Sequence, residues 1–181
     1  MTTSQFQGVL LHKLQARFGV GCAKEWRAFE TSEGHYAPRL DLAVGPFAYG
    51  ERQCGPEYDE ASVVHARYLN ELWAAFAANV REYTGHAPEY DFKAALASNW
   101  NARCFLAIEI ENRVSRKHLM GGAINAAALG RIGVVVGWSD DKVRALMNLR
   151  LYLTALGKFN KPTFKTANLL VLSREQALAL L

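Results

Sequence analysis

The chain has 181 residues, of which 50% are hydrophobic and 21% are charged. This length and composition predict one compact domain with a sizeable core over residues 1–181, and we expect no second domain. The longest apolar runs, such as residues 132–138, are far too short to span a bilayer, and neither terminus resembles a signal peptide. We therefore expect a soluble, cytoplasmic protein that does not bind membranes.

The cysteines exclude two further classes of small protein. Cys22, Cys54 and Cys104 are odd in number and widely spaced, and no C-x-x-C pair occurs. The sequence therefore predicts neither a disulfide framework nor a zinc knuckle, and we expect reduced thiols.

The net charge of +4 is unevenly distributed along the chain. Residues 1–111 carry 10 Lys and Arg against 14 Asp and Glu, whereas residues 112–181 carry 11 against 3. The basic C-terminal part fits an electrostatic footprint for a polyanion, and it fits equally well an ordinary solvated surface on which the charges are scattered.

A helix followed by a hairpin is predicted at the start of the chain. Apolar residues recur at helical spacing over residues 5–18, and Gly19 ends that helix. Residues 23–30 and 39–47 have the composition of two strands joined by a turn. In the second strand, alternation places Asp41 on the less apolar face.

A helical insertion is predicted next, over about residues 52–100. Residues 48–57 are rich in Gly, Pro and charge, which indicates an exposed loop. Helical periodicity follows over residues 59–83, with Asp59 as a candidate N-cap. Residues 91–100 form either a short helix or an irregular connector.

The C-terminal part predicts a βαβ unit and a further helix and strand. Residues 104–111 and 132–138 are apolar strands, and the helix between them, from Ser115 to 129, is rich in small residues that let it lie close to a sheet. Ser139 caps another helix, and residues 167–173 form a last strand. The expected fold is α/β, with a central mixed β-sheet flanked by helices and a helical insertion between the second and third core strands.

Two carboxylates share one face of the strand over residues 104–111. Because side chains alternate along a strand, Glu109 and Glu111 point the same way, with their Cα atoms about 6.6 Å apart. Both side chains can then reach one hydrated cation. A third ligand has to come from elsewhere in the chain.

The strand PRLDLAV, with Asp41, and the strand AIEIEN, with Glu109 and Glu111, together resemble the PD-(D/E)xK nuclease superfamily. The resemblance runs from the first helix to the strand at 138, and its motif is short. It implies the restriction-endonuclease-like fold and hydrolysis of phosphodiester bonds in DNA with Mg²⁺ or Mn²⁺. It also implies that a homodimer is possible.

The resemblance also assigns roles to residues of this chain. Asp41 and Glu109 would bind the cation, with the main-chain carbonyl of Ile110 completing its coordination. Glu111 would act as general base or as ligand to a second cation, and Lys117 would supply the catalytic ammonium group. The basic residues after the strand would hold phosphate: Arg113, Arg116, Lys117 and His118.

The chain departs from the superfamily pattern in three places. Arg39 and Leu40 separate Pro38 from Asp41, and Glu111 stands where Lys is usual. The interval from Asp41 to Glu109 is also long. The insertion within it suggests dimerisation or contact with the substrate.

Other interpretations stay open at this point. Asp41 and Glu109 could pair with Arg39 and Arg113 at a solvent-facing sheet edge. The chain could be a non-catalytic DNA-binding or protein-interaction module of the same fold, or an α/β enzyme that acts on a small molecule.

Further residues carry weaker expectations. Either Glu25 or Glu30, on opposite faces of the first hairpin strand, could add an acidic ligand. His118 could be a helix-start residue rather than a phosphate contact. The four tryptophans are expected to pack in the core.

Overall fold

The computed structural model describes residues 1–19, 21–29, 37–112, 115–159 and 165–181, and for Arg116 it describes only the backbone. In chain order, the elements are α1 (Thr3–Phe18), β1 (Cys22–Arg27), β2 (Arg39–Val44), α2 (Gly55–Val64), α3 (Ala66–Thr84), α4 (Phe92–Ala97), β3 (Cys104–Glu111), α5 (Arg116–Leu129), β4 (Gly130–Gly137), α6 (Asp140–Lys158), β5 (Leu169–Ser173) and α7 (Arg174–Leu180). No helix among the described residues combines the length and apolar character needed to cross a bilayer.

The strands form one mixed sheet in the order β1-β2-β3-β4-β5. The pairs β1/β2 and β2/β3 are antiparallel, and the pairs β3/β4 and β4/β5 are parallel. Every residue of β3 and β4 is buried, which agrees with their nearly continuous apolar sequences and with cover on both faces. The expected α/β architecture, a mixed sheet flanked by helices, is therefore present.

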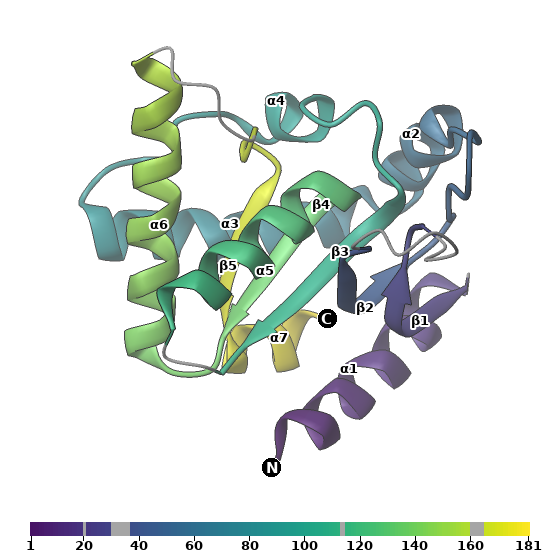
Figure 1. Cartoon of the computed structure of the whole chain (residues 1–181), viewed down its shortest axis with the longest axis horizontal. Helices are drawn as coiled ribbons and strands as arrows, with labels where there is room; N and C mark the ends of the chain where they lie inside the picture. Colours follow the sequence, from purple (N-terminus) through teal and green to yellow (C-terminus); the bar gives the residue numbers. More distant parts are fainter. Residues whose placement is uncertain (20, 30–36, 113–114, 160–164) are drawn as a thin grey trace.

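Helices cover both faces of the sheet (Figure 1). In the view of Figure 1, α5 lies in front of the sheet, α3 passes behind it, and α6 stands beside it on the β5 side. Gly133 of β4 lies directly against the backbone of Ala126 in α5, as the small residues of that helix predicted. Behind the sheet, Asn79 of α3 donates a hydrogen bond of 2.9 Å to the carbonyl oxygen of Val171 in β5.

The insertion between β2 and β3 consists of three helices, and the predicted single helix over residues 59–83 is wrong. The helical stretch begins at Gly55 and breaks at His65, whose φ of −101° and ψ of 17° interrupt the α-helix. Asp59 is not an N-cap, because Pro56 already lies in the first turn of α2. The side chain of Asp59 is used in a tertiary contact instead.

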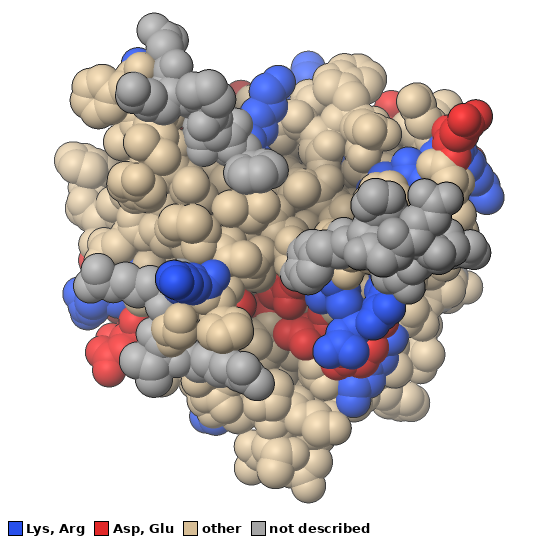
Figure 2. Space-filling model, in the orientation of Figure 1, with Lys and Arg blue, Asp and Glu red and all other residues tan. Residues whose placement is uncertain are grey.

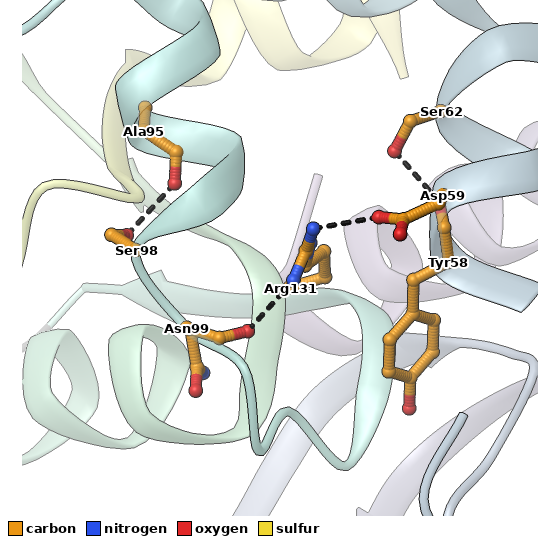
Figure 3. A network of polar contacts seen from close by, with 7 residues as sticks. All are labelled: Tyr58, Asp59, Ser62, Ala95, Ser98, Asn99 and Arg131. Carbon is orange, nitrogen blue, oxygen red and sulfur yellow. Dashed lines mark hydrogen bonds and ion pairs between the residues drawn. The ribbon is translucent and has the colours of Figure 1, made fainter. Parts of the chain in front are cut away.

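That contact fastens the insertion to the sheet (Figure 3). Arg131 of β4, which is 5% exposed, places Nη2 2.7 Å from Oδ1 of Asp59 in α2. Its Nη1 donates to the carbonyl oxygen of Asn99, which follows α4, at 3.2 Å. The Asn99 amide in turn donates to the carbonyl oxygens at the end of α5: Ala127, Ala128 and Gly130.

Two other expectations are corrected at the periphery of the fold. The last helix, α7, was not predicted, although Ser173 and Gln176 form a capping box that marks its start. Trp26 is buried as expected, but Trp100 is 73% exposed and lies over the guanidinium of Arg131, so it is not a core residue.

Candidate functional site

The acidic residues of β2 and β3 meet where the two strands separate. The antiparallel register pairs Leu42 with Ile108, and its continuation by one residue puts Asp41 opposite Glu109. There the carboxylate of Asp41 replaces a main-chain partner, because the amide of Ile110 donates to its Oδ2 at 2.7 Å. The structure thus brings together the two side chains that the sequence analysis placed on neighbouring strands.

Asp41 is held from three sides. Gln7 of α1, which is 5% exposed, donates from Nε2 to Oδ1 of Asp41 at 2.7 Å. Besides this bond and the bond from Ile110, Asp41 shares a hydrogen bond with Glu109. The alternative in which Asp41 simply pairs with Arg39 is not what is observed, because Arg39 pairs with Glu25 at 2.7 Å.

Burial and neighbouring charge change the protonation of this pair. Burial, together with the negative charges of Asp41 and Glu111, raises the pKa of Glu109 to about 9, against the opposing effect of a hydrogen bond from Asn125 of α5. Burial also raises the pKa of Asp41, against the hydrogen bonds that it accepts. At neutral pH Glu109 therefore keeps a proton and donates it in the hydrogen bond to Asp41.

Glu111 lies under the first half of α5, next to Gly122. It is 8% exposed, and a Cβ built on Gly122 would lie 3.3 Å from Cδ of Glu111 and closer still to its Oε1. The absence of a side chain at residue 122 therefore leaves the space that the Glu111 carboxylate fills. The same Cβ would lie 3.6 Å from Cβ of Glu109, which puts both glutamates beneath one turn of the helix.

The basic residues of the site are not all placed with the acids. Lys117 and His118 are exposed in the first turn of α5, and in the described part of the chain no hydrogen bond or ion pair joins either side chain to the acidic residues. His118 is tied locally, since its amide donates to the carbonyl oxygen of Ser115 at 3.0 Å. Arg113 and the side chain of Arg116 lie outside the described residues, as does Glu30.

Glu25 is the nearest further acid. The register pairs Lys24 with Leu42 and Trp26 with Leu40, so Glu25 of β1 lies across from Asp41, and its charge contributes to the raised pKa of Asp41. Its φ of 54° is in the left-handed region that side chains other than glycine rarely adopt. Glu25, Asp41 and Glu109 thus form one row across three strands.

Two functional partners were missed by the sequence analysis. Gln7 and Asn125 lie on different helices, far along the chain from the acids whose carboxylates they contact. The only signal in the sequence was that each is a polar residue within a predicted helix. Such a residue contacts solvent more often than a buried acid, so the signal was not specific.

The donor set fits a hard cation in part. Asp41 and Glu109 offer carboxylate oxygens that converge, and such oxygens are the ligands that Mg²⁺ and Mn²⁺ prefer. Within the residues that the structure describes, however, no three His, Cys, Asp or Glu side chains form a group poised to hold a metal ion. A cation here would therefore take two side-chain ligands and complete its shell with main-chain oxygen, water or a reoriented Glu111.

Acidic atoms reach the surface on the face of the molecule that carries α5. Figure 2 shows Asp and Glu atoms near the centre of that face, with Lys and Arg atoms next to them on the β1 side.

Comparisons with known proteins give this chain no family. No protein-family model, no curated protein and no solved structure matches it. Its function is therefore inferred from the site itself and from the motif resemblance.

Proposed function

We propose that the chain is a metal-dependent nuclease of the PD-(D/E)xK type, which hydrolyses phosphodiester bonds in DNA with Mg²⁺ or Mn²⁺. The observation that carries the proposal is the convergence of Asp41 and Glu109, whose carboxyl groups are hydrogen-bonded to each other across two neighbouring strands beside Glu111. Buried like charges are costly, and no ion pair in the described part of the chain joins Asp41 or Glu109 to a basic side chain. Loss of the Glu109 proton would leave two adjacent buried negative charges, which a divalent cation in place of the proton would neutralise.

The residues would divide the work as follows. Asp41 and Glu109 would hold the cation, which when bound neutralises charge on the phosphate and lowers the pKa of a water molecule. Glu111 would accept the proton of the attacking water as general base. Gln7 and Asn125 would fix the two ligating carboxylates in place, and loss of such supporting contacts typically costs about 10- to 100-fold in metal affinity or activity.

The basic residues at the start of α5 would contact the substrate. Lys117 and His118 are exposed there, and we propose that they hold phosphate together with Arg113 and Arg116. Lys117 is also the candidate for the catalytic ammonium group. That role requires its flexible side chain to turn toward the acids when substrate binds.

A cleavage assay tests the proposal. Supercoiled plasmid is incubated with MgCl₂ and with wild type, Asp41→Ala or Glu109→Ala, and Asp141→Ala, an exposed acid in α6, is the matched control. We expect nicking by wild type and by the control, and background nicking by the two site variants. Equal nicking by all four proteins, or none by wild type, would contradict the proposal.

A second candidate is a non-catalytic module of the same fold. It is favoured by one observation: both carboxylate oxygens of Asp41 already accept hydrogen bonds within the protein, from Gln7 and Ile110. A thermal-shift titration with Mn²⁺ separates the two candidates. A true site stabilises the folded state by about 2.7 kcal/mol at a hundred times its Kd, and the Asp41→Ala variant should then lose the response.

A further inference from the structure

A pair of arginines borders the acidic site on strands β1 and β2. The antiparallel register places Arg27 directly opposite Arg39, and both side chains are exposed. Like charges directly opposite each other on paired strands destabilise a sheet. The sheet therefore keeps this pair at a cost to its stability.

Nearby acidic side chains neutralise only one of these two arginines. Arg39 is joined to Glu25 by an ion pair of 2.7 Å, in which the two side chains are 56% and 39% exposed. No ion pair joins Arg27 to an acidic side chain anywhere in the described ranges of the chain. Among the described residues, one positive charge of the pair is thus uncompensated.

The two arginines share a face of the sheet with the acidic row. Arg39 is two residues from Asp41 in β2, so alternation sends both side chains to the same face, and the register puts Arg27 opposite Arg39 on that face. The ion pair between Arg39 and Glu25 brings the Glu25 carboxylate next to them. At about 3.3 Å per residue, the arginine row lies only about 7 Å along the strands from the acidic row. A ligand that spans the two rows can contact both at once.

Among the described residues, no helix packs over this part of the face, since Glu25, Arg27 and Arg39 are all exposed. α5 packs mainly on β3 and β4, where it buries Glu109 and Glu111, and the exposed Glu25, Arg27 and Arg39 lie beyond it. Figure 2 shows the corresponding arrangement, with blue Lys and Arg atoms next to the red acidic atoms on the β1 side of the face.

We infer that Arg27 and Arg39 bind the phosphate backbone of a nucleic acid and position it across the acidic row. A guanidinium group presents parallel N–H donors that match phosphate oxygens, and exposed arginines spaced along a strand suit a repeating anion better than a single one. The choice of a nucleic acid rests on the proposed function. The arginine pair itself belongs to no motif of the superfamily and was not among the phosphate contacts expected from the sequence.

The test measures the affinity of the protein for a fluorescein-labelled DNA duplex by anisotropy, in EDTA so that no cleavage occurs, at salt concentrations from about 50 to 200 mM. The variant is Arg27→Gln with Arg39→Gln. The matched control is Arg67→Gln with Arg81→Gln, which removes the same charge from exposed positions on α3, on the other side of the sheet. A third protein, Arg27→Lys with Arg39→Lys, keeps the charge and removes the guanidinium geometry.

Each lost phosphate contact lowers the salt slope of the affinity by about one unit, so we expect the glutamine variant to lose about two units and the control none. The lysine variant should keep most of the slope. Equal affinity and slope for the glutamine variant and the control, or no binding by wild type at the lowest salt, would overturn the inference.

The same proteins separate this inference from the proposed function. Plasmid cleavage by wild type together with unchanged binding by the glutamine variant would refute the arginine contacts and leave the nuclease. Arginine-dependent binding without cleavage by wild type would refute the nuclease and leave the contacts.

Discussion

The two halves of one face of the sheet differ in how far their charged side chains are buried. Over β3 and β4, the helix α5 lies so close that Glu109 and Glu111 are each only 8% exposed, and Glu109 keeps a proton. Over β1 and β2 the face is open, and Glu25, Arg27 and Arg39 stay exposed. The difference suggests two separate roles. Burial under α5 sets the protonation of Glu109, whereas the exposed side chains on β1 and β2 are available to contact a ligand.

A close backbone contact in the covered half predicts the largest effect of a single substitution on stability. A Cβ on Gly133 would lie 2.6 Å from the backbone of Ala126, so Gly133→Ala has to push α5 away from the sheet. We expect the free energy of unfolding, measured with urea, to fall by about 3 kcal/mol. Gly121→Ala, in α5 with open space around it, is the control and should be neutral or stabilising. Equal stability of the two variants would show that the helix is not seated as described.

The shared proton predicts a dependence of stability on pH. The pKa of Glu109 is about 9 in the folded protein against 4.5 ordinarily, so between these values the folded state keeps a proton that the unfolded state has released. The free energy of unfolding should therefore fall as pH rises through that window, by up to about 1.4 kcal/mol per pH unit. The stabilising contribution of the Glu109 proton is fully present only below pH 4.5.

The measurement is a series of denaturant titrations in EDTA across that window. Glu109→Gln keeps a donor toward Asp41 but has no proton to lose, so its stability should change much less with pH. Parallel pH profiles for wild type and this variant would mean that Glu109 titrates normally.

The supporting contact from α1 predicts an intermediate effect. Gln7→Leu removes the donor 2.7 Å from Oδ1 of Asp41 and leaves a buried acid partly unsatisfied. We expect a loss of about 1–3 kcal/mol, whereas Gln15→Leu, at an exposed position of the same helix, should be nearly neutral. If both substitutions cost the same, the hydrogen bond contributes nothing to stability.

In the open half the expected effect on stability is smallest and of opposite sign. Arg27→Gln relieves the repulsion with Arg39, so the free energy of unfolding should rise by a few tenths of a kcal/mol, within a range of about 0.2–1. Arg67→Gln, which removes an i,i+4 ion pair with Glu71, should leave stability unchanged or slightly lower. A clear loss of stability in Arg27→Gln would show that this arginine has a structural partner.

The sequence predicted those parts of the fold that depend on local patterns. The continuous apolar runs of β3 and β4, and the glycine that ends α1, gave the strands, the first helix and the mixed sheet between helices. These features need no knowledge of which distant residues meet. The pairing of Asp41 with Glu109 is different, because it was expected only from the resemblance to the superfamily, which has one acid on each of two neighbouring strands.

The features that were missed depend on contacts between distant segments. Gln7 and Asn125 reach the acids from separate helices. The insertion helix breaks at His65, whose ring packs against Phe18 of α1 and Phe105 of β3. Asp59 has the sequence character of an N-cap, but its partner is Arg131, which is 72 residues further along. Local pattern contains no information about such partners.

The most direct test of the central claim is a crystal structure of the protein grown with Mn²⁺, with the anomalous signal used to locate the ion. We predict one peak bonded to a carboxylate oxygen of Asp41 and to one of Glu109, with Gln7 and Asn125 still in contact with those side chains. A map with no peak at this position, and with the hydrogen bond between the two acids intact at high Mn²⁺ concentration, would contradict the claim.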